Sequence, residues 1–89
     1  LITLYNSQPL NCQIEILKAL GRIASGRHLD FLNNEFLHSY NFDIHMNAAR
    51  SIIRHNTQSS RLLLNELMET TNEESQLIIK HCHNPLIKF

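Results

Sequence analysis

Three consecutive residues near the end of the chain, His81, Cys82 and His83, have the side chains that bind zinc. Imidazole and thiolate are common zinc ligands in proteins. On a helix, however, residues two apart point about 200° apart around the axis. His81 and His83 therefore cannot face one ion together, and the sequence offers no obvious fourth ligand. We interpret Cys82 as a core residue between two surface histidines, and we expect no metal site and no cofactor.

The other histidines do not form a site either. The chain has six, a number that would suit a pH sensor, because imidazole titrates near neutral pH. His28, His38, His45 and His55 are scattered over the starts, ends and polar faces of the expected helices. We interpret them as surface residues exposed to solvent.

The residue types needed for covalent catalysis are sparse. Cys12 and Cys82 are the only thiols, and Cys12 occupies an apolar helix position, where thiols are usually inert. No Gly-x-Ser-x-Gly elbow and no glycine-rich phosphate loop is present. The adjacent pair Glu73 and Glu74 is better explained as charge at the start of a helix. We therefore expect no catalytic residue and no enzyme activity.

Four basic residues form the pattern most indicative of a function. Lys18 and Arg22 are four residues apart and share one helix face, and Arg50 and Arg54 repeat this spacing 32 residues later. If the two helices stack, the four cations form a two-by-two array that would receive an acidic segment of a protein partner. Alternatively, these cations complement the dipoles at the helix C-termini and stay in solvent.

Composition limits the class of partner. Eight lysines and arginines balance eight aspartates and glutamates, so the formal net charge is zero. Nucleic-acid-binding proteins show a basic excess, because their cations displace counterions from phosphates. We therefore expect no nucleic-acid partner. The longest apolar runs are far shorter than the roughly 20 residues that cross a bilayer, so we expect no direct membrane contact from this segment.

The cysteines and the chain ends bear on where the protein works. Two isolated cysteines make no disulfide framework and no signal peptide is visible, so we expect the cytoplasm, a reducing compartment. The chain begins at Leu1 and ends at Phe89, both apolar. We therefore expect a fragment of a longer protein, whose other parts could carry a membrane anchor. The exposed apolar ends predict either missing flanking repeats or self-association of the fragment.

The spacing of apolar residues is helical almost throughout, whereas strand-like alternation never persists. Ser7, Asn41 or Asp43, and Asn72 are expected N-caps, and Pro85 should end the last helix. In the first helix we expect Ile23 to lie on the buried face with Leu17 and Leu20. The five expected helices cover about residues 8–24, 27–38, 42–55, 59–70 and 72–84.

The helices repeat with a period of 32 residues. Shifting the sequence by this amount aligns Ser7 with Ser39, Leu20 with Ile52, and the first basic pair with the second. Caps, apolar positions and basic positions thus recur together. We divide the single domain, residues 1–89, into units of about 7–38, 39–70 and a partial third unit, 71–89.

The segment CQIEILKALGRI, residues 12–23, resembles the second helix of a HEAT repeat, through Cys12, Ile16, Leu17, Leu20, Gly21 and Ile23. The segment IHMNAARSIIRH, residues 44–55, is similar but departs from the pattern at Ile53 and His55. The resemblance implies a short right-handed α-solenoid of antiparallel helix pairs. Gly21, which costs about 1 kcal/mol in a helix interior, is then expected where a neighbouring helix approaches closely.

HEAT-type proteins usually act as scaffolds or docking surfaces, and their second helices line the concave surface where partners dock. The resemblance thus implies a non-catalytic protein-interaction module, with Lys18, Arg22, Arg50 and Arg54 as the docking residues. An alternative is part of a HEAT-like enzyme, such as a lyase or a DNA glycosylase, whose active site lies mostly outside this segment. A third reading is a plain helical bundle.

Overall fold

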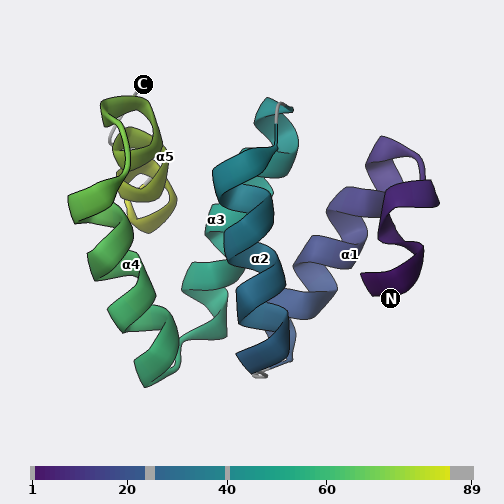
Figure 1. The fold of residues 1–89 in the computed structure, drawn as a ribbon, viewed down its shortest axis with the longest axis horizontal. Coiled ribbons are helices and arrows are strands. Elements are labelled where there is room, and N and C mark those ends of the chain that lie inside the picture. The colour runs from purple at the N-terminus through teal and green to yellow at the C-terminus, as the bar shows by residue number, and fades with distance from the viewer. Residues whose placement is uncertain (1, 24–25, 40, 85–89) are drawn as a thin grey trace.

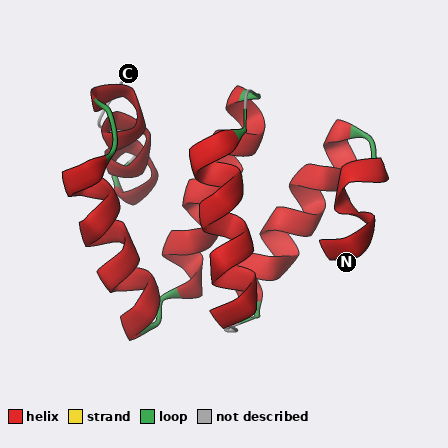
Figure 2. Ribbon diagram, viewed as in Figure 1, coloured by secondary structure: helices red, strands yellow, loops and turns green. Residues whose placement is uncertain are grey.

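The computed structural model describes residues 2–23, 26–39 and 41–84. Helices dominate these ranges, which contain no strand (Figure 2). The predicted all-α class is therefore confirmed. The elements in order are a 3-10 helix, η1 (Ile2–Ser7), and five α-helices, α1 (Leu10–Arg22), α2 (Gly26–His38), α3 (Phe42–His55), α4 (Gln58–Thr70) and α5 (Glu73–His83).

Two of the predicted N-caps are confirmed. The side chain of Asn41 accepts a hydrogen bond from the amide of Ile44, and that of Asn72 accepts one from the amide of Ser75. Such caps satisfy amide groups that have no partner within the helix. The cap of α4 was not predicted; it is a reciprocal capping box between Thr57 and Ser60.

The start of α1 differs from the prediction. Ser7 is the last residue of η1 rather than an N-cap, and Pro9 takes the N-cap position without a side-chain hydrogen bond. The amide of Gln8 donates to the carbonyl of Tyr5, which continues the 3-10 turn past Ser7. At the other end, Ile23 is 47% exposed and not buried as predicted, because α1 stops at Arg22 and the backbone of Ile23 is extended.

The helices form two layers, and α3 is the central helix of the rear one. In Figure 1, α2 and α4 lie in front, with α1, α3 and α5 behind them. Each of the other four α-helices contacts α3. The radius of gyration is 12.1 Å, as expected for a compact domain of this length. None of the helices in the described ranges is both long and apolar enough to span a membrane.

The core lies between the two layers and includes a residue of the N-terminal 3-10 helix η1. Tyr5, which the sequence analysis did not assign, is buried and meets Phe31 edge-on, with ring centroids 5.0 Å apart. The largest fully buried apolar side chains are Tyr5, Leu17, Leu20, Leu32, Phe36, Ile52, Ile78 and Ile79.

The contact between α1 and α3 explains the glycine. A Cβ atom added at Gly21 would lie 2.9 Å from both Cα and Cβ of Ser51, closer than real Cβ atoms come to other heavy atoms. The hydroxyl of Ser51 also donates a hydrogen bond of 2.7 Å to the carbonyl of Leu17. The predicted close approach of a neighbouring helix at Gly21 is therefore confirmed.

Helix α5 meets α3 differently. Ser75 lies 3.4 Å from the His45 ring, and the Cys82 thiol donates to the carbonyl of Met46. Ser75 and Cys82 are two turns apart, or about 10 Å, yet both contact the first turns of α3. Helix α5 therefore crosses α3, and its packing does not copy that of α1.

Candidate functional site

The four predicted docking residues lie beside the seam between α1 and α3. Leu17 and Gly21 face Ser51 across this seam. Lys18 and Arg22 each follow a seam residue, so they are turned about 100° away from it. Arg50 precedes Ser51 by one residue and Arg54 follows it by three. Around the axis of α3, both side chains are therefore rotated away from the seam in the sense opposite to that of Lys18 and Arg22 on α1.

Because α1 and α3 run in the same direction (Figure 1), these opposite rotations bring both pairs to one side of the seam. Arg22, Arg50 and Arg54 are exposed. Lys18 is half-buried and forms an ion pair with the exposed Glu15 at 3.4 Å; such partly exposed pairs contribute little. On each helix the basic pair lies away from the fully buried core residues. We call these four residues the basic array.

His81, Cys82 and His83 gather no further metal-ligating side chain around them in the part of the chain that the structure describes. The described ranges contain no group of three or more His, Cys, Asp or Glu side chains that could hold an ion. Cys82 packs against the core, as predicted, and His83 is exposed, but His81 is half-buried. Burial raises the pKa of Cys82, although nearby Arg50 opposes this. Cys12 and Cys82 are free thiols.

The prediction that four histidines are solvent-exposed holds for His38 and is wrong for the other three. His55 is buried, with its ring 3.1 Å from the hydroxyl of Thr57. His45 is half-buried and stacks on Phe36, with ring centroids 4.4 Å apart and planes 8° from parallel. Burial lowers the pKa of His45 and outweighs the Phe36 backbone and Glu74, which raise it. His38 is exposed and His28 is half-buried.

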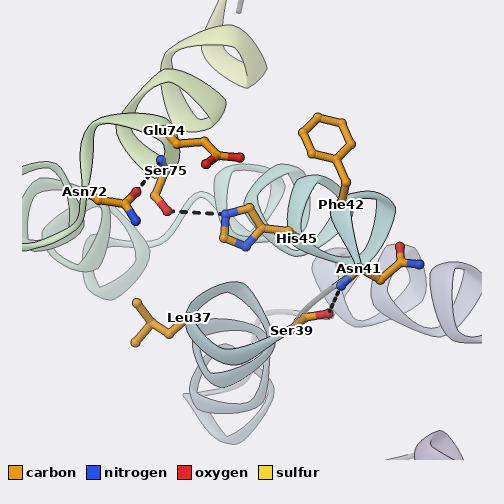
Figure 3. A pocket seen from close by; sticks show the side chains of 8 residues that line it. All are labelled: Leu37, Ser39, Asn41, Phe42, His45, Asn72, Glu74 and Ser75. Atoms are coloured by element: carbon orange, nitrogen blue, oxygen red, sulfur yellow. Dashed lines mark hydrogen bonds between the residues drawn. The ribbon is translucent and has the colours of Figure 1, made fainter.

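A pocket of about 270 Å³ opens beside His45, where the end of α2 meets the starts of α3 and α5. Figure 3 shows the His45 ring directed toward the hydroxyl of Ser75, with Leu37 on the neighbouring helix α2. We call this the upper pocket, and its lining includes Leu37, Asn41, Phe42, His45, Glu74 and Ser75.

A second pocket, of about 330 Å³, lies between α2 and α4. Its lining residues on α4 recur at i, i+3, i+4 and i+7, the spacing of one helix face. We call this the lower pocket, and its lining includes Leu29, Asp30, Asn33, Leu62, Leu63 and Glu66. A third pocket, of about 310 Å³ between α4 and α5, is lined mainly by Leu64, Met68 and Ile79.

The sequence contained a signal for the histidines that was missed. His45, Ala48, Ala49 and Ile52 are spaced i, i+3, i+4 and i+7, so His45 shares the buried face of α3. His55 extends the same face by three residues. In contrast, the sequence held no comparable signal for the pockets, because they are formed where separate helices meet.

Comparison with known proteins identifies no relative of this chain. No protein-family model matches the chain, and neither a curated protein nor a solved structure matches it. Function is therefore inferred from the geometry of the chain itself.

Proposed function

We propose that this chain is a non-catalytic protein-interaction module, in which the basic array receives an acidic segment of a partner protein. The observation that carries the proposal is the close seam at Gly21 and Ser51. It fixes α1 against α3 and leaves Lys18, Arg22, Arg50 and Arg54 on one exposed side. Four cations on a rigid base can face several carboxylates together, which isolated surface charges cannot do.

We further propose that the helices belong to a HEAT-like right-handed α-solenoid, with α1, α3 and α5 as second helices. Supporting this are the 32-residue repeat, the two layers, and the contacts of α3 with α1 and α5. The crossing of α5 over α3 favours the alternative, a plain bundle. Small-angle scattering of a longer chain would decide: the radius of gyration of a solenoid grows steadily with added repeats, whereas that of a globule grows with about the 0.38 power of length.

The docking proposal is tested with a fluorescein-labelled dodecamer of glutamate, measured by fluorescence anisotropy at low and physiological salt. The array variant replaces all four cations with glutamine (K18Q/R22Q/R50Q/R54Q). Exposed ion pairs contribute about 0.2–1 kcal/mol each, so losing four should weaken binding by about fourfold to a thousandfold.

The chain provides a matched control, because its eight basic residues divide into the array and four others. The control variant replaces the other four and has the same net charge as the array variant (R27Q/R61Q/K80Q/K88Q). We expect its affinity to stay within about threefold of wild type. Equal weakening in both variants would mean that net charge, and not the array, holds the peptide.

A further inference from the structure

The upper and lower pockets lie along the same side of α2. Asp30 lines the lower pocket and Leu37 lines the upper one. These residues are seven apart, which is about 20° short of two full turns and about 10 Å along the axis. The two pockets are therefore in line on one side of α2, separated by two helical turns.

Exposed apolar side chains gather at these pockets. The described residues include five large apolar side chains that are notably exposed, and three of them line the two pockets. Leu62 of the lower pocket is 61% exposed, and Leu37 and Phe42 of the upper pocket are 45% and 50% exposed. The lower pocket thus offers apolar contacts to a molecule that enters it, and Leu37 and Phe42 offer them at the upper pocket, whose lining is otherwise mostly polar.

The charged side chains that line the two pockets are acidic. Asp30 and Glu66 line the lower pocket from opposite helices, and Glu74 lines the upper one. Among the described lining residues there is no lysine or arginine. Arg61, the one arginine in α4, is directed to the side chain of Asn56. Burial lowers the pKa of His45, which favours the neutral ring and so reduces its repulsion of a cation.

We propose that the two pockets form one docking groove for an amphipathic helix of a partner protein. The helix would carry apolar residues at positions i and i+7, with lysines or arginines beside them. A helix presents the same face every seven residues, about 10 Å apart, which matches the separation along α2. The apolar residues enter the two pockets, and the cations meet Asp30, Glu66 and Glu74.

This groove differs from the basic array in position and in chemistry. The array lies on α1 and α3 and is proposed to take acidic segments, whereas the groove follows α2 and takes basic apolar ones. The two surfaces can therefore be tested separately, and failure of one leaves the other standing.

The test uses a 15-residue peptide of alanine and lysine with leucines at positions 4 and 11, titrated into the 15N-labelled protein. We expect chemical-shift changes at Asp30, Leu37, Leu62 and Glu74. A peptide with leucines at positions 4 and 9 should bind about threefold or more weakly, because its second leucine points to another side of the helix. A peptide with glutamates replacing the lysines should cause no shift changes at Asp30, Leu37, Leu62 and Glu74, and any shifts it causes should lie at the basic array. Equal shift changes at the groove residues with all three peptides would overturn the proposal.

Variants locate the contact. Losing exposed ion pairs in D30N/E66Q should weaken binding about threefold to tenfold at low salt. Because Leu62 is exposed, the L62S variant should still fold. This variant should weaken binding as well. The array variant K18Q/R22Q/R50Q/R54Q is the control and should bind the lysine peptide as the wild type does. Shift changes confined to α1 and α3, or unchanged affinity in D30N/E66Q, would refute the groove.

Discussion

Replacing Gly21 with alanine tests the tight seam between α1 and α3. The new Cβ would lie 2.9 Å from Cα and Cβ of Ser51 and 3.1 Å from its carbonyl oxygen. Two of these atoms belong to the backbone, so rotation of a side chain cannot relieve the contact. Overpacking costs about 1–3 kcal/mol, whereas alanine recovers up to about 1 kcal/mol of helix propensity. We therefore expect a net destabilisation of up to about 2 kcal/mol.

Urea denaturation followed by circular dichroism measures this effect. With an m-value of about 1 kcal/mol per molar urea, the midpoint should fall by up to about 2 M. Gly26 is the matched control, because a Cβ there meets nothing within 4 Å. Gly26→Ala should be neutral or slightly stabilising. If Gly21→Ala stabilises the protein as Gly26→Ala does, the two helices are not in close contact and the reasoning fails.

Three further predictions concern single side chains. Asn41→Ala removes the cap of α3 and should lower the free energy of unfolding by about 1 kcal/mol, seen as a lower urea midpoint. The pKa of His45 is lowered in the folded state, so the unfolded chain takes up this proton first as the pH falls. Stability should therefore decline below about pH 6.5, and His45→Phe, which keeps a ring against Phe36, should reduce that decline; an unchanged slope would show that other groups cause it. Burial raises the pKa of Cys82, so Cys82 should react with a disulfide reagent more slowly in the native protein than in urea, and equal rates would contradict its packing against the core.

Much of the fold follows from local patterns in the sequence. The predicted range of α3, residues 42–55, agrees with the structure, and the caps at Asn41 and Asn72 are confirmed. These features depend on residues close together in the chain, namely apolar periodicity and a side chain that reaches an amide three residues on. Gly21 was also interpreted correctly, because a glycine inside a helix needs a reason for its cost.

The differences from prediction arise where distant segments meet. Tyr5 is buried because η1 folds back on Phe31, and no periodicity in seven residues indicates such a contact. His45 is covered because Phe36 and Ser75 lie against it, although its position on the apolar face of α3 was visible. The basic array lies on one side of the seam because its two pairs repeat along the chain and because α1 and α3 run in the same direction. Its role remains a proposal.

The two layers divide the charge of the molecule. The layer of α1, α3 and α5 carries five cations and four acids, whereas the layer of α2 and α4 carries two cations and four acids. A chain with no net charge exerts little attraction at long range, and salt at physiological strength screens charges beyond about 8 Å. The separated layers instead form an electric dipole across the thickness of the domain. A charged partner arriving within that distance would exert a torque on the domain, so orientation, more than the rate of approach, is what this charge pattern controls.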